Sequence, residues 1–364
     1  MASSTSTTAI VLGGGGARTA YQAGVLAYLR HAFPHVDISI ITGMGAGAMN
    51  ASILAGQAGS WSEGARNLVA FWDDLQPERA FHARSLWDLV TQLVRHQPSA
   101  RQSLLDPAPL RTQLADVLAT DDAGVLSGVQ HNVNDGWLEA LVVATTHYGS
   151  LETVTWSQGA PMTPSEAGRS VRPATLTLDH VMAAVSLALL FPAVSIRGEW
   201  HGAGVGLRRP AAPARTLGAD RILALSTRSR QSSSHASADE VYPSPLQVAS
   251  ILSNTLLLDS IGSEARSDDA GENERAASPG SRETGEDVLL IEPSVDLTDV
   301  AERLDVEVDT ALGTVLQYLH GEGTRLPDLL SMLLFEPQYL RRLLLVGYAD
   351  ARGRRDQLEH FFEG

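Results

Sequence analysis

The 364-residue chain contains no cysteine. This absence excludes disulfide bonds, thiolate metal sites and cysteine nucleophiles. Lysine is absent as well, so all 27 lysine-plus-arginine positions are arginine. No motif for a metal or a cofactor stands out, and we expect neither.

A positive charge balance is also missing, since the formal net charge is -15. The long-range field of such a protein repels nucleic-acid phosphates and anionic lipid surfaces. We therefore expect no nucleic-acid partner and at most peripheral contact with a membrane.

Long apolar runs are absent too. The longest, Val181 to Val194, is shorter than the roughly 20 residues of a membrane-spanning helix and is interrupted by Ser186 and Pro192. The first eight residues, MASSTSTT, have neither the basic nor the apolar region of a secretion signal. We expect residues 1–8 to be a disordered lead-in and the protein to be cytoplasmic.

What the sequence does contain is a repeated strand-turn-helix pattern. Ala9 to Leu12 reads as a buried strand, followed by glycines and by helix-spaced apolar residues over Ala20 to Leu29. Asp37 to Thr42 and Ala46 to Ala55 repeat the pattern. Two such units in succession predict an α/β fold with parallel strands and right-handed crossovers.

Further elements follow from the same reading. A hairpin is expected around Tyr148-Gly149-Ser150. The other expected elements are the strands Leu138 to Thr146, Leu151 to Ser157, Arg221 to Ser226 and Val288 to Ile291, and the helices Thr177 to Leu190, Asp309 to Leu319, Pro327 to Phe335 and Pro337 to Tyr348.

These elements predict a core over residues 9–228 and a C-terminal part of the same domain over 246–364 with a helical layer. Residues 229–245 and the acidic insertion 263–287 carry too few apolar residues to offset their ordering entropy, which predicts a mobile loop and a disordered insertion. The C-terminal helices have leucine-rich faces, for example Leu329, Leu330, Leu333 and Leu334. We expect these faces to pack on the main domain, and an acyl-chain or membrane surface is the alternative.

The first glycine-rich loop, Gly13 to Arg18, reads GGGGAR. Glycines between a strand and a helix let backbone N–H groups converge on an anion. A dinucleotide site is the less favoured alternative, because Arg18 or Thr19 stands where the third glycine of G-x-G-x-x-G is required.

The second turn, Gly43 to Gly47, reads GMGAG and has the frame of a nucleophile elbow, G-x-S-x-G. In that motif Gly43 and Gly47 are the flanking glycines that allow the sharp turn. The middle residue, which carries the nucleophile, is Gly45 here.

Taken together, the segments IVLGGGGARTAYQAGVL (Ile10 to Leu26) and ITGMGAGAMNA (Ile41 to Ala51) strongly resemble the patatin-like phospholipases of bacteria. The resemblance extends through Ser103 to Asp106 and Leu189 to Pro192 to Gly218-Ala219-Asp220. It implies a three-layer α/β/α fold with a mostly parallel central sheet plus C-terminal helices.

The resemblance also implies roles for individual positions. In that family a serine at the elbow and an aspartate in a D-G-G or D-G-A motif hydrolyse an ester, and the glycine loop with its arginine forms the oxyanion hole. The oxyanion loop is retained as Gly14, Gly15, Gly16 and Arg18, with Thr19 where the family has glycine. The serine position falls on Gly45 and the aspartate position on Gly202.

Three residues, Thr42, His201 and Asp220, are candidate substitutes for the two side chains. His201 stands beside the aspartate position, but a base without a nucleophile achieves nothing. Thr42 precedes the elbow and is expected to point into the core, and Asp220 matches a position that is structural in the family. Ala184 and Ala188 also replace the family's usual serine and proline, so the changes extend beyond the dyad.

The leading hypothesis is therefore a pseudoenzyme that keeps the oxyanion-loop pocket and binds a lipid, a fatty-acyl group or another protein. An active lipid acyl hydrolase with a relocated nucleophile is one alternative. A regulatory or scaffolding subunit, with the acidic insertion as a contact tail, is the other.

Overall fold

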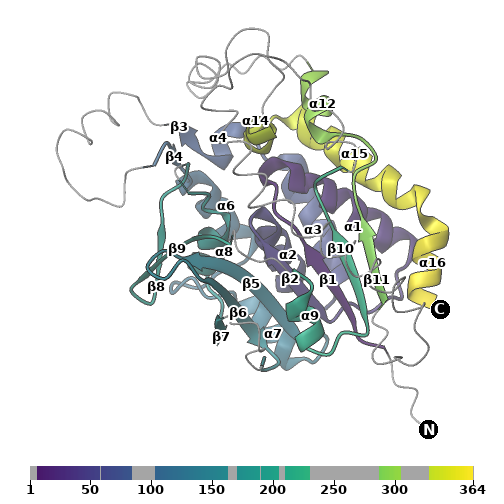
Figure 1. Ribbon diagram of the computed structural model, residues 1–364, viewed down its shortest axis with the longest axis horizontal. Coiled ribbons are helices and arrows are strands. Elements are labelled where there is room, and N and C mark those ends of the chain that lie inside the picture. Colours follow the sequence, from purple (N-terminus) through teal and green to yellow (C-terminus); the bar gives the residue numbers. More distant parts are fainter. Residues whose placement is uncertain are drawn as a thin grey trace, which may run out of the picture.

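The structure is a computed structural model, and it describes residues 6–57, 59–83, 103–162, 170–188, 190–204, 210–229, 287–304 and 328–363. Its centre is a mostly parallel sheet with helices on both faces, the α/β/α arrangement that the family resemblance implies (Figure 1). The main path of the sheet is β11 (Asp287–Ile291), β10 (Arg221–Leu225), β1 (Thr8–Leu12), β2 (Ile40–Met44), β5 (Ala140–His147), β6 (Thr153–Gly159) and β7 (Ser170–Pro173).

The five strands from β11 to β5 run parallel, as the strand-turn-helix units predict. β6 turns back antiparallel to β5, which confirms the predicted hairpin. β9 (Glu199–Ala203) is antiparallel to the last residues of β5 and pairs with the short β8 (Val194–Ile196). β3 (His82–Ala83) and β4 (Leu105–Asp106) form a separate pair.

Alternate residues of β1 show why the sheet is buried on both faces. Ile10 and Leu12 belong to the large core under the main helical layer, whereas Ala9 and Val11 belong to a smaller core with Ala214 of α9 (Ala212–Thr216). Successive side chains of a strand point to opposite faces, so a strand between two helical layers is apolar throughout. The mostly alanine composition of the second core lets α9 lie close to the sheet.

The main helical layer is built on α1 (Ala20–Ala32), which packs along α15 (Pro337–Gly353). The other described helices besides α9 are η1 (Gly16–Thr19), α2 (Ala46–Gly56), α3 (Trp61–Asp74), α4 (Pro77–Ala80), α6 (Ala108–Val117), α7 (Ser127–Asn134), α8 (Leu178–Val185), α12 (Leu297–Glu302), α14 (Asp328–Leu333) and α16 (Arg355–Glu363).

Helix α8 is shorter than the predicted helix Thr177 to Leu190. It begins at a capping box, in which Thr177 and His180 satisfy each other's backbone N–H groups. It ends at Val185, because Ser186 leaves the helical region with ψ 83° and its hydroxyl turns back to the Met182 carbonyl at 2.7 Å. The prediction of a helix through Leu190 was wrong.

The beginning of the chain also differs from the prediction. The lead-in was expected to extend through residue 8, but β1 begins at Thr8, and the Thr7 amide donates to Asp220 at 2.8 Å. These last two residues of the predicted lead-in are held by the sheet edge.

The C-terminal helices α14 and α15 confirm two of the three predicted helices, and the predicted helix Asp309 to Leu319 lies outside the described residues. So does the predicted mobile loop beyond Ser229, and so does the acidic insertion except for Asp287, the first residue of β11. Leu330, Leu333 and Leu334 are buried, as packing of the helical layer on the main domain requires. No helix within the described ranges is long and apolar enough to cross a membrane.

Candidate functional site

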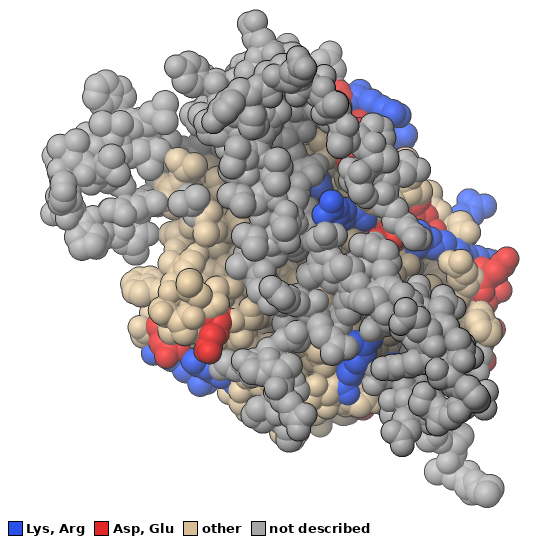
Figure 2. All heavy atoms as spheres, in the orientation of Figure 1, with Lys and Arg blue, Asp and Glu red and all other residues tan. Residues whose placement is uncertain are grey.

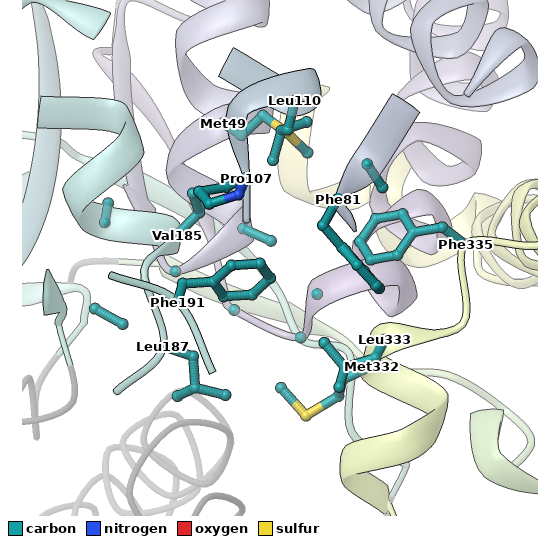
Figure 3. Close-up of a pocket in the computed structure, with 18 of the residues that line it drawn as sticks. Met49, Phe81, Pro107, Leu110, Val185, Leu187, Phe191, Met332, Leu333 and Phe335 are labelled. Atoms are coloured by element: carbon teal, nitrogen blue, oxygen red, sulfur yellow. The ribbon is translucent and has the colours of Figure 1, made fainter. Parts of the chain in front are cut away.

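The carboxyl ends of β1 and β2 bring the two glycine-rich turns together. The Gly14 Cα lies 3.1 Å from where a Cβ at Gly45 would stand, so the loops touch. Both loops line one pocket, together with side chains from α2, α3, α6, α8 and the segment around α14 (Figure 3). The residues that line it are Gly14, Gly15, Gly16, Gly45, Ala46, Met49, Trp72, Ala80, Phe81, Pro107, Leu110, Ala184, Val185, Leu187, Phe191, Ala203, Met332, Leu333 and Phe335.

The pocket is an apolar slot. It encloses about 760 Å³ outside protein atoms, its open mouth included. Phe81 stands edge-on to both Phe191 and Phe335, with ring centroids 5.9 and 5.7 Å away (Figure 3). Such walls fit a thin apolar group better than a bulky polar one.

Gly45 has the backbone of a nucleophile elbow without its side chain. Its φ of 55° and ψ of −137° lie in a region that only glycine adopts without strain. The space beside it is nearly free, since a Cβ there would meet only the Gly14 Cα. Glycine therefore relieves the strain that a serine stores at such a turn.

The two flanking glycines, in contrast, are required by close packing. A Cβ at Gly47 would lie 2.3 Å from the Leu12 carbonyl oxygen, and one at Gly43 would lie 2.5 Å from the Ala48 Cα. The turn can therefore form only with glycine on both sides, and this frame is intact.

Backbone donors surround the position of the missing side chain. Among the described residues, the N–H groups of Gly14, Gly15 and Gly16 have no hydrogen-bond acceptor. The N–H of Ala46, the first residue of α2, has no intrahelical acceptor either. In nucleophile-elbow hydrolases the residue after the nucleophile supplies one oxyanion donor. The sequence reading missed Ala46, although its place directly after Gly45 was a sufficient signal.

Arg18 is not part of the pocket lining, which corrects its predicted place in the oxyanion and ligand site. Its side chain is 2% exposed and donates to the Ser331 hydroxyl at 2.7 Å and to the Thr298 hydroxyl at 2.6 Å. Next to it, burial raises the pKa of Tyr339 to about 12. Arg18 thus ties the glycine loop to α12, α14 and α15 instead of facing a ligand.

Because Arg18 holds α14 against the glycine loop, α14 and the residues after it form part of the pocket wall. The Met332 carbonyl oxygen lies 2.1 Å from where a Cβ at Gly16 would stand, so α14 packs directly on the loop. Met332, Leu333 and Phe335 then line the slot. The leucine-rich pattern indicated packing of these helices and did not distinguish the residues that face the pocket.

A buried amide network fixes the loop from the opposite side. Gln22 donates to the Gly13 carbonyl at 2.8 Å, and Asn50 donates to the Gln22 side chain at 2.9 Å. The Trp72 indole in turn donates to Asn50 at 2.9 Å, so its polar atom is already satisfied. Such a network holds the oxyanion-type loop in a single shape without using a charged group.

The structure does not bring Gly202 into the pocket. A Cβ at Gly202 would lie 2.2 Å from the Tyr148 hydroxyl oxygen and 2.7 Å from the Tyr148 Cζ. The space of a side chain at this position is therefore filled by a phenol ring. Its neighbour on β9, Ala203, is the residue that lines the pocket.

The three candidate substitutes, His201, Thr42 and Asp220, do not line the pocket either. His201 is fully buried, with its Nδ1 3.2 Å from the Thr145 hydroxyl, and burial together with the nearby His147 lowers its pKa. Thr42 is buried and does not line the pocket, as expected. Asp220 is bonded to Thr7 at the amino ends of β1 and β10, the sheet edge away from the elbow, which confirms a structural role.

The comparison with family models identifies one family. A family model described as patatin-like phospholipase matches residues 10–214. A search of curated proteins finds no match. Among solved structures, VipD from Legionella pneumophila is 12% identical with a TM-score of 0.39, covering 97% of this chain and 67% of that one.

Human GIVD cytosolic phospholipase A2 in complex with methyl gamma-linolenyl fluorophosphonate is 14% identical, with a TM-score of 0.46. The alignment covers 98% of this chain and 59% of the human one, so the chain spans less than two thirds of that protein's length. A structure of SpcU in complex with ExoU from Pseudomonas aeruginosa gives 14% identity, a TM-score of 0.26 and coverage of 96% and 77%.

Proposed function

The chain belongs to the patatin-like phospholipase family, whose model spans residues 10–214 of its 364, and on this premise we propose that it binds a fatty-acyl ligand without hydrolysing it. The protein is then a pseudoenzyme that keeps the pocket and the backbone donors of a hydrolase. In this proposal cleavage does not occur, because the described pocket lining offers no group that would carry it.

One observation carries the proposal. The described residues that line the pocket include no serine, threonine, histidine, aspartate or glutamate. Loss of the catalytic serine in a comparable hydrolase lowers kcat by roughly 10⁶-fold, with only the modest effect of the oxyanion hole and binding left. A pocket without either a nucleophile or a base supports binding alone.

The hydroxyl groups nearest the glycine loop have other partners. The Thr227 hydroxyl donates to the Gly14 carbonyl at 2.6 Å, and the Ser331 hydroxyl accepts from Arg18. Both side chains are buried. These contacts favour binding over the alternative of a hydrolase with a relocated nucleophile. A regulatory or scaffolding role stays a prediction.

The pocket also suggests how a fatty acid binds. Its carboxylate is placed against the N–H groups of Gly14 to Gly16 and Ala46, because preorganised donors at a helix start favour an anion. The acyl chain extends along the phenylalanine walls, where burial contributes about 0.8 kcal/mol per methylene. In this arrangement backbone N–H groups, and not the Arg18 side chain, bind the carboxylate.

Titration calorimetry with palmitate tests this function. The Leu187→Glu variant adds a negative charge at a half-buried lining position, and we expect it to weaken palmitate binding by about tenfold or more. Leu345→Glu adds the same charge at a position 62% exposed on α15 and serves as the matched control. Equal affinities in all three proteins, or no palmitate binding at all, contradict the proposal.

A second arm separates binding from catalysis. The wild-type protein is incubated with a lysophospholipid and the bound molecule is identified by mass spectrometry. An intact lysophospholipid supports a non-hydrolytic pocket, whereas released fatty acid supports the relocated nucleophile.

A further inference from the structure

A second hollow lies on the outer surface of the helical layer, away from the glycine loops. It is a groove that encloses about 1140 Å³ outside protein atoms, its open face included, between the last turns of α1, the last turns of α15 and the start of α16. Its lining residues are Tyr28, His31, Ala32, Tyr348, Arg352 and Arg355.

The charge of this groove differs from that of the protein. The chain carries a net charge of -15, yet none of the lining residues is acidic. Figure 2 shows blue and red side chains side by side at several places on the described surface, and some described arginines elsewhere are ion-paired, for example Arg111 with Asp179 and Arg341 with Asp73. The groove therefore concentrates positive charge on an acidic molecule.

Two arginines supply most of that charge. Arg352 and Arg355 are exposed, and within the described part of the chain no carboxylate lies within ion-pair distance of Arg352. Arg355 uses its Nε for Glu359, at 2.6 Å, which leaves the two terminal nitrogens of its guanidinium for a ligand. Guanidinium groups bind phosphate in a forked geometry and are its preferred partners in proteins.

The aromatic residues shape the rest of the groove. Tyr28 is almost fully buried and stands edge-on to the half-exposed Tyr348, with ring centroids 5.3 Å apart. The exposed His31 adds a ring nitrogen that can donate. A ligand with both a phosphate and a planar or apolar part can therefore meet the arginines with one end and the tyrosines with the other.

From this geometry we propose that the groove binds a phosphomonoester, a second site that is independent of the acyl pocket. The phosphate dianion lies between Arg352 and Arg355, and the organic part lies over Tyr348. Failure of the acyl-binding proposal leaves this site untouched, because the two hollows share no lining residue.

Calorimetric titration of the full chain at low salt with phenyl phosphate tests the proposal. We expect the double variant Arg352→Ala/Arg355→Ala to weaken binding by about tenfold or more, since each charged hydrogen bond is significant. Arg342→Ala removes an exposed arginine of the same helix outside the groove and is expected to bind normally. An equal loss in Arg342→Ala, or no binding by the wild type, overturns the proposal.

Further arms define the ligand. Inorganic phosphate is expected to bind several-fold more weakly than phenyl phosphate, because it lacks the ring that contacts Tyr348. Flotation with vesicles that contain phosphatidic acid distinguishes a lipid headgroup from a free phosphomonoester, and recruitment that depends on both arginines supports the same phosphate site. Arg352→Lys/Arg355→Lys keeps the charge and the fold, so unchanged affinity in this variant contradicts a forked arginine site.

Discussion

The elbow at Gly45 and the strand at Gly202, the two positions where the resemblance to the family places the catalytic side chains, have different surroundings. At Gly45 the frame is intact, because both flanking glycines are still required and the space for a side chain is nearly free. At Gly202 that space is taken by Tyr148. A Cβ at the first position meets only the Gly14 Cα, whereas at the second it meets the end of the Tyr148 side chain.

This difference explains why glycine suits one position better than the other. The positive φ of Gly45 makes glycine the least strained residue there, so the turn is more stable with glycine than it would be with serine. Gly202 lies in an ordinary strand, where glycine is unfavourable unless another group needs the space. The Tyr148 ring is that group.

The largest effect is expected at the frame of the elbow. Gly47→Ala places a Cβ against the Leu12 and Gly13 carbonyl oxygens, and we expect a loss of about 3 kcal/mol or more in the free energy of unfolding. Chemical denaturation measures it. Gly353→Ala is the control, since nothing lies within 4 Å of its Cβ, and it should be neutral or slightly stabilising. Equal stability of the two variants contradicts an intact, closely packed frame.

The next effect is a pH dependence of stability. It does not arise in the elbow pocket, whose described lining has no titratable side chain, but at His180 of α8. Burial and the charge of Arg197 hold the pKa of His180 down from 6.5 to about 4, so between these values the unfolded chain binds a proton and the folded protein does not. This contribution to stability is complete above pH 6.5 and is lost as the pH falls to 4, in total about 3 kcal/mol.

His180→Asn isolates this contribution, since the asparagine oxygen can replace the ring Nδ1 that accepts from the Thr177 N–H at 3.1 Å. We expect its free energy of unfolding, measured from pH 7 to pH 4, to fall less steeply than that of the wild type. His35→Asn, at an exposed position, is the control. If the free energy of unfolding of His180→Asn depends on pH as steeply as that of the wild type, His180 does not make this contribution.

A smaller effect tests whether Tyr148 has closed the Gly202 position. Gly202→Asp should destabilise the fold by about 1–3 kcal/mol, because the phenol must move. In the background of Tyr148→Ala the same substitution should cost markedly less, which a double-mutant cycle measures as a coupling energy. Additive costs contradict the assignment of Tyr148 as the occupant.

The smallest effect is expected for Gly45→Ser. Its cost is mainly backbone strain, about 1–2 kcal/mol, because the added Cβ meets only the Gly14 Cα, at 3.1 Å. Thermal denaturation measures it, and the loss should be smaller than for Gly47→Ala. A cost as large as that of Gly47→Ala contradicts a free space at the elbow.

The parallel strands and both glycine turns could be predicted from the sequence, because apolar periodicity and the two glycine patterns are local signals. The direction in which the Arg18 side chain points could not be predicted, since its partners Ser331 and Thr298 are far along the chain. For the same reason the filling of Gly202 by Tyr148 has no local signature. The early end of α8 at Val185 had a partial signal in Ser186, which competes with the helix through its hydroxyl.

The central claim, a pocket that has lost its nucleophile, is tested most directly by mass spectrometry after treatment with a long-chain fluorophosphonate, which reacts with activated serine or threonine hydroxyls. The account predicts an unmodified wild-type mass and ester hydrolysis at the rate of the protein-free buffer. Stoichiometric addition of the phosphonate, mapped to one hydroxyl and accompanied by loss of turnover, would contradict it.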